Sequence, residues 1–64
     1  MTKTPTITDK RRWLRLLREQ QSKANRKMAL ADTSALREGW NQVGLALGWV
    51  IELAEADLAR EVRS

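Results

Sequence analysis

The sequence predicts an all-α fold, a two-helix hairpin that dimerises into a four-helix bundle. Two long stretches with helical spacing of apolar residues flank the only interior cluster of turn and N-cap residues, Asp32-Thr33-Ser34. The second stretch includes Val43 to Ala54, which is apolar on almost every face and carries one charge, Glu52. A 64-residue chain cannot enclose such a helix alone, so we expect a second chain to cover it.

The first predicted helix spans about residues 9–30, because this stretch contains no Gly and no Pro. Residues 1–8 hold the only proline and should form a flexible arm, and 9–64 form a single domain. Thr8 and Asp9 are the expected N-caps. Polar Gln20 and Gln21 interrupt the apolar stripe of this helix, which consists of Trp13, Leu14, Leu17, Ala24, Met28 and Ala31.

The second predicted helix spans about residues 35–61, after a turn at 31–34. Its apolar residues form two neighbouring rows, which together are too wide for one partner helix. The first row has the heptad spacing of a packed seam and consists of Leu36, Trp40, Val43, Leu47, Val50 and Ala54. The second row consists of Leu45, Trp49, Leu53 and Leu58.

Three glycines lie inside this second helix, and each costs about 1 kcal/mol relative to Ala. Gly44 and Gly48 are four residues apart, so they share a face where another helix backbone could approach closely. Alternatively, the glycines leave room for Trp40 and Trp49. One of these two tryptophans should fill the hairpin core and the other the contact between chains.

We therefore expect the hairpin core and the dimer interface to share one set of residues. No cofactor or metal is expected, because the chain contains no Cys and no His. The second helix contributes Trp40, Val43, Gly44, Leu47, Gly48, Val50 and Ile51, and the first contributes Trp13, Leu17 and Met28.

The charge is divided between the two halves of the chain. Residues 1–31 contain nine Lys/Arg and two acids, net +7, whereas residues 32–64 contain three Arg and six acids, net −3. This division can draw the halves together, and it can leave a basic face for an anionic partner. Nucleic acid is a possible partner, bound through Arg11, Arg15, Arg18 and Arg26. The alternatives are a solvated helix face or a helix on a membrane surface.

An enzyme is not expected, because no His, Cys or Tyr is present and the carboxylates Glu52, Glu55, Asp57 and Glu61 suit a solvated surface. The longest uncharged apolar run has nine residues, whereas a membrane-spanning helix needs about 20. The first ten residues also lack the apolar core of a signal peptide. We therefore expect no membrane span and a cytoplasmic location.

The T-K-T-P start, the closing L-A-R-E-V-R-S and the charge-split hairpin resemble the small early proteins that temperate lambdoid phages encode between their recombination and excision genes. The resemblance covers the whole chain and transfers no functional residues. It implies a non-enzymatic early protein in the bacterial cytoplasm that modulates phage development or host physiology by binding other molecules. We expect a host or phage protein as the partner. The expected architecture is also similar to plasmid copy-number regulators that bind RNA as four-helix bundles, although their sequence does not match.

Overall fold

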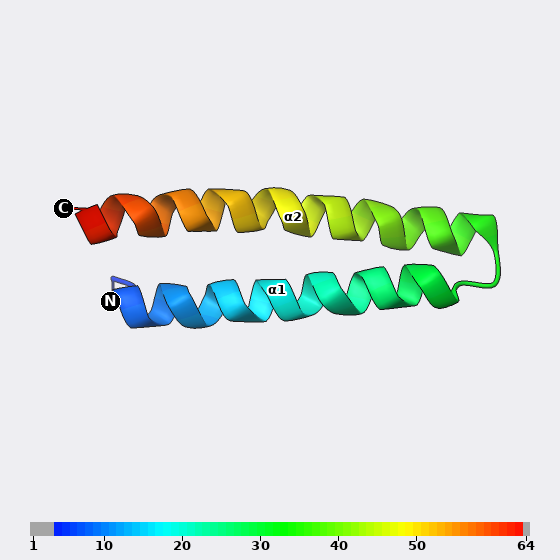
Figure 1. The fold of residues 1–64 in the computed structure, drawn as a ribbon, viewed down its shortest axis with the longest axis horizontal. Helices are drawn as coiled ribbons and strands as arrows, with labels where there is room; N and C mark the ends of the chain where they lie inside the picture. Colours follow the sequence, from blue (N-terminus) through cyan, green and yellow to red (C-terminus); the bar gives the residue numbers. More distant parts are fainter. Residues whose placement is uncertain (1–3, 64) are drawn as a thin grey trace.

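The fold is an antiparallel pair of α-helices (Figure 1), seen in a computed structural model that describes residues 4–63. Helix α1 spans Ile7–Leu30 and helix α2 spans Ser34–Arg63. The two helices lie side by side over most of their length, and a short turn joins them at one end of the molecule. The prediction of an all-α two-helix hairpin is confirmed.

Helix α1 begins with a capping box at Thr6. The Thr6 hydroxyl accepts a hydrogen bond from the Asp9 backbone N–H at 3.1 Å, and the Asp9 carboxylate accepts one from the Thr6 N–H at 3.2 Å. This reciprocal pair satisfies two N–H groups of the first turn. The prediction of Thr8 or Asp9 as the N-cap is therefore wrong, and the last two residues of the predicted arm are helical. Residues 1–3 of that arm lie outside the described residues.

The turn between the helices spans residues 31–33, within the predicted turn at 31–34. Ala31 caps α1, and its backbone N–H donates to the Met28 carbonyl at 3.3 Å. The Thr33 hydroxyl then accepts a hydrogen bond from the Leu36 N–H at 3.2 Å, as an N-cap residue does. Helix α2 begins at Ser34 and continues to Arg63, two residues past the predicted end.

The two helices pack along one seam with alternating steps of three and four residues. Its most buried members are Leu14 and Ala24 of α1 and Gly44 and Ile51 of α2. The half-buried members are Leu17, Gln21 and Met28 of α1 and Trp40, Leu47, Ala54 and Leu58 of α2.

Three residues of the set predicted for the hairpin core and the dimer interface lie outside the seam of the hairpin, and their place in a dimer interface stays a prediction. Trp13 keeps 48% of its surface exposed, because Leu14 rather than Trp13 faces α2. On α2, Val43 and Val50 each keep 42% exposed, since the seam passes through the neighbouring Gly44 and Ile51. The predicted row and the observed seam share only Trp40, Leu47 and Ala54.

At Gly44 and Gly48, side chains of α1 occupy the space beside α2. A Cβ atom added at Gly44 would lie 3.1 Å from the Asn25 side-chain oxygen, and one added at Gly48 would lie 3.0 Å from Nε2 of Gln21. The same Gln21 nitrogen donates a hydrogen bond to the Gly44 carbonyl at 3.4 Å. The atoms nearest to these positions are polar side-chain atoms of α1, so neither a helix backbone nor a tryptophan fills the space that the two glycines leave. Gly39 differs, because an added Cβ would meet nothing within 4 Å.

The glycines therefore predict opposite effects of substitution on stability. Gly44→Leu should lower the free energy of unfolding by about 1–3 kcal/mol, because the new side chain must push α1 away. Gly39→Ala should raise it by about 0.5–1 kcal/mol, because Ala favours the helix and meets no neighbour. Urea unfolding followed by circular dichroism, at one protein concentration, measures both. A Gly44→Leu protein as stable as the original chain would contradict the close seam.

Candidate interaction surfaces

The hairpin has two distinguishable sides, which the ion pair between Arg18 and Glu55 defines. Arg18 Nη2 lies 2.7 Å from Glu55 Oε2, and each residue follows a buried residue, Leu14 or Ile51, by four positions. This position therefore faces the same side of the hairpin in both helices. Residues that directly precede a buried residue lie together on the opposite side.

The first surface is the apolar face, which we define as Trp13 of α1 with Leu36, Val43 and Val50 of α2. Trp13 and the two valines directly precede buried residues, and Leu36 lies seven residues before Val43, so all four share the side opposite Arg18. Each keeps between 42% and 55% of its surface exposed. An apolar hollow of about 310 Å³ lies at the turn end of this face and includes Leu36 and Val43 in its lining.

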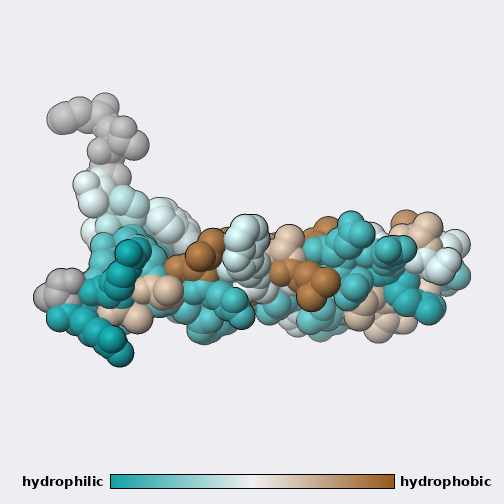
Figure 2. Space-filling model, turned by 90° about the horizontal axis from the view of Figure 1, so that it is seen from above, coloured by the Kyte–Doolittle hydropathy of each residue, from teal (hydrophilic) through white to brown (hydrophobic). Residues whose placement is uncertain are grey.

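More apolar surface continues around the outer side of α2. Trp49 is 68% exposed, and Leu45 and Leu53 are also exposed. Figure 2, which looks at the molecule from the α2 side, shows hydrophobic surface along the middle of the hairpin, broken by paler and hydrophilic side chains. The expectation that one tryptophan fills the hairpin core fits Trp40, which is half-buried beneath the Lys27 ammonium, 4.7 Å from the ring centre. A contact between Trp49 and a second chain stays a prediction.

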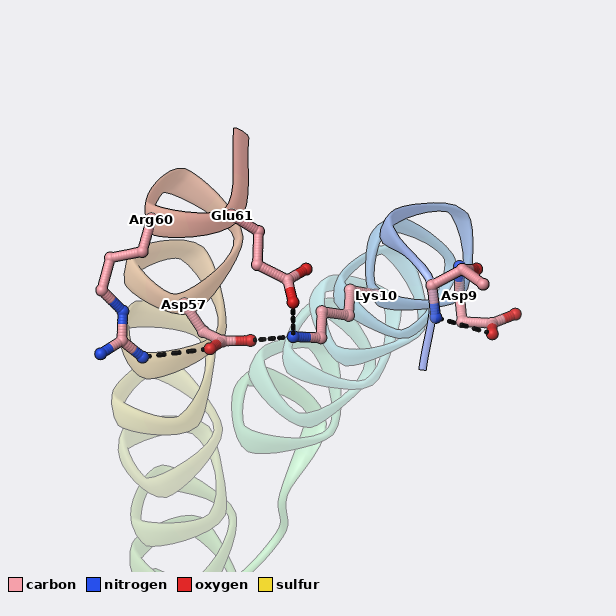
Figure 3. Close-up of polar contacts among 6 residues, drawn as sticks. Asp9, Lys10, Asp57, Arg60 and Glu61 are labelled. Atoms are coloured by element: carbon pink, nitrogen blue, oxygen red, sulfur yellow. Dashed lines mark hydrogen bonds and ion pairs between the residues drawn. The ribbon is translucent and has the colours of Figure 1, made fainter. Parts of the chain in front are cut away.

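An ionic cluster joins the two helices at the end of the hairpin where α1 begins and α2 ends (Figure 3). Lys10 Nζ lies 2.7 Å from Asp57 Oδ2 and 2.8 Å from Glu61 Oε1, so one ammonium group joins the start of α1 to the end of α2. Arg60 approaches the other Asp57 oxygen at 3.1 Å. The opposite charges of the two halves thus attract within one hairpin.

These contacts change the pKa values of the groups involved. The hydrogen bond from Lys10 lowers the pKa of Asp57, with a smaller contribution from Arg60. The hydrogen bonds to Asp57 and then Glu61 raise the pKa of Lys10. The hydrogen bonds from Thr6 lower the pKa of Asp9 in the capping box.

The second surface is the basic groove, a hollow of about 650 Å³ on the Arg18 side of the hairpin. Its charged lining consists of Arg11, Arg15 and Arg18 from α1 with Glu55 and Arg63 from α2. Its apolar lining consists of Leu14, Leu58, Ala59 and Val62. Three of the four arginines proposed from sequence for an anionic partner therefore lie together.

Arg26 does not line the basic groove, and Arg63, which does, was not among the predicted residues. Arg63 could have been found from the predicted topology, because an antiparallel hairpin places the last turn of α2 beside the first turns of α1. Only Glu55 partly neutralises the groove, through Arg18. No ion pair joins Arg11, Arg15 or Arg63 to another residue in the described part of the chain.

Several carboxylates of the described chain take part in ion pairs rather than in a group suited to a metal ion. Within residues 4–63, no group of three or more potential ligands is placed to hold a metal ion. Of the four carboxylates noted in the sequence, Glu55, Asp57 and Glu61 lie in ion pairs and Glu52 is exposed. Neither described helix has the length and hydrophobicity needed to cross a membrane. Known protein families, curated proteins and solved structures contain no match to this chain.

The ionic cluster predicts that stability falls at both ends of the pH scale. Asp57 has a lowered pKa in the fold, so its contribution is present above its unfolded value of 3.8 and is lost as pH falls through the lower folded value. Lys10 has a raised pKa, so its contribution is present below 10.5 and is lost as pH rises through the higher folded value. Thermal unfolding followed by circular dichroism across this pH range measures both losses.

Lys10→Met is the matched variant for this measurement, because it removes the cation and keeps much of the apolar stem. It should melt at a lower temperature than the original chain near pH 7, and the difference should shrink below about pH 4 and in high salt. A difference that does not change with pH or salt would show that the cluster adds no electrostatic stability.

Proposed function

We propose that this chain is a non-enzymatic interaction module that works as a homodimer, with two hairpins packed through their apolar faces into a four-helix bundle. The observation that carries the proposal is the apolar face itself. Large apolar side chains line one side of the seam and remain about half exposed, whereas the buried apolar residues of the described hairpin are only Leu14, Ala24 and Ile51. Exposed apolar surface of this kind marks an interaction site.

The total surface of the chain supports the same proposal. The chain exposes 5440 Å², whereas a compact monomer of 7.4 kDa exposes about 4,200 Å². The excess, about 1,200 Å², exceeds the roughly 800 Å² that each partner contributes to a standard interface. A second copy that covers about 800 Å² of each chain would bring the surface per chain closer to that of a compact protein.

A second copy suits the apolar face because the face repeats with heptad spacing. Leu36, Val43 and Val50 are seven residues apart, so they form a straight line along α2. A line centred on Val43 is complementary to itself, as a two-fold interface requires. The ionic cluster of Lys10 and Asp57 lies beyond the Val50 end and gives the apolar face a polar border.

The resemblance to early proteins of lambdoid phages supports a cellular role for such a module. In that role the dimer acts in the cytoplasm of the bacterial host, where it binds a host or phage protein and thereby modulates phage development or a host process. Binding rather than catalysis is the activity proposed for this chain, and the dimer is the form that binds.

Charges placed on the apolar face should separate the two chains. Val43→Glu/Val50→Glu should weaken association by about 3 kcal/mol or more, roughly a hundredfold, because the dimer contains four such valines that are about half exposed in the free hairpin. Sedimentation equilibrium measures the dissociation constant, and circular dichroism checks that the helices remain.

The matched control is Ser22→Glu/Asn41→Glu, which adds the same charge at exposed positions away from the apolar face. This control should dimerise like the original chain. Leu47→Asp is less informative, because Leu47 lies in the seam and its substitution would disturb the hairpin and the dimer together. An original chain that sediments as a folded monomer would overturn the proposal.

A further inference from the structure

We infer that the basic groove binds a short acidic segment of a partner protein, a helical segment with carboxylates on one side and apolar residues beside them. The groove lies within one hairpin, on the side opposite the apolar face. The inference therefore concerns a second surface and does not depend on the dimer.

The charges of the groove select an anionic ligand. Arg11 and Arg15 of α1 face the groove together with Arg63 of α2, and none of the three has an ion pair within the described chain. The one carboxylate in the lining, Glu55, already pairs with Arg18 at 2.7 Å. Guanidinium groups bind carboxylates through two parallel hydrogen bonds, so these arginines suit Glu or Asp side chains.

The apolar lining selects against a ligand that offers charge alone. Leu58, Ala59 and Val62 lie between the arginines of α1 and Arg63, and Val62 keeps 58% of its surface exposed. An amphipathic segment covers these side chains while its carboxylates reach the rim. Arg11 and Arg18 are seven residues apart, about 10 Å along the helix, so the rim matches about two turns of a bound helix.

Nucleic acid fits this groove less well than an acidic segment does. A phosphate backbone continues beyond a 10 Å rim, and on the α2 side it would meet Glu52 and Glu55. The half of the chain that contains α2 has a net charge of −3, so the cations that would attract a long polyanion lie mostly on the α1 side of the hairpin. A short acidic segment in the groove meets Glu55, the one carboxylate of the lining, whose charge already pairs with Arg18.

The probe for this inference is a short synthetic helical peptide with Leu and Glu at helical spacing, labelled with a fluorophore. Fluorescence anisotropy at about 0.15 M salt measures its binding to the full chain. Arg11→Gln/Arg15→Gln should weaken binding at least tenfold. The matched control, Arg12→Gln/Arg26→Gln, removes the same charge from α1 outside the groove and should weaken binding less than threefold.

Two further comparisons test the apolar part and the class of ligand. Val62→Thr keeps the shape of the side chain and should weaken peptide binding several-fold, and a peptide with every Glu replaced by Gln should not bind. Sedimentation equilibrium of each variant should give the dimer of the original chain, which separates a failure of the groove from a failure of the dimer.

Three results would overturn the inference. Equal losses in the two double-arginine variants would show attraction to net charge rather than to the groove. Unchanged affinity of the Val62→Thr protein for the peptide would show that the ligand does not contact the apolar lining. Tighter binding of a DNA or RNA duplex than of the peptide, with steep loss in salt, would identify the arginines as a nucleic-acid site.

Discussion

The packing of α1 side chains against Gly44 and Gly48 of α2 is the constraint on which the other features depend. Ala24, Gly44 and Gly48 leave so little space in the seam that side-chain atoms of α1 lie about 3 Å from where a Cβ would stand on α2. The seam passes through Gly44 and Ile51, so the residues that directly precede them cannot also face α1. Val43 and Val50 therefore lie beside the seam, and the apolar face is the consequence of this register.

The sequence was sufficient for the helices and the turn, but it did not determine which side of α2 faces α1. Between Val43 and Ala54 almost every residue is apolar, so two overlapping rows satisfy the same three-and-four spacing. Hydrophobic periodicity cannot choose between them. The choice follows from contacts across the hairpin, namely the space opposite Gly44 and the ion pairs of Lys10 with Asp57 and Glu61.

The candidate site was predictable only in the part that one helix contributes. Arg11, Arg15 and Arg18 share a side of α1 by spacing alone, and the structure lines them along one groove. Arg63 comes from the other end of the chain, and its place depends on the register of α2, which the sequence left open. Arg26 follows the same basic pattern, but it lies along α1 past the region where the groove residues of α2 are available.

The positions of the two surfaces would connect the proposed dimerisation with the proposed binding of a partner. The apolar face and the basic groove lie on opposite sides of the seam, so a dimer formed through the apolar face leaves the groove of each chain open. Two-fold symmetry then gives one assembly two identical grooves. A partner that presents two acidic segments at the matching distance would bind both, and the second contact would raise the overall affinity by about 10²–10⁴ without any new kind of contact. In such an assembly the apolar face sets the strength of binding at a groove that it does not touch.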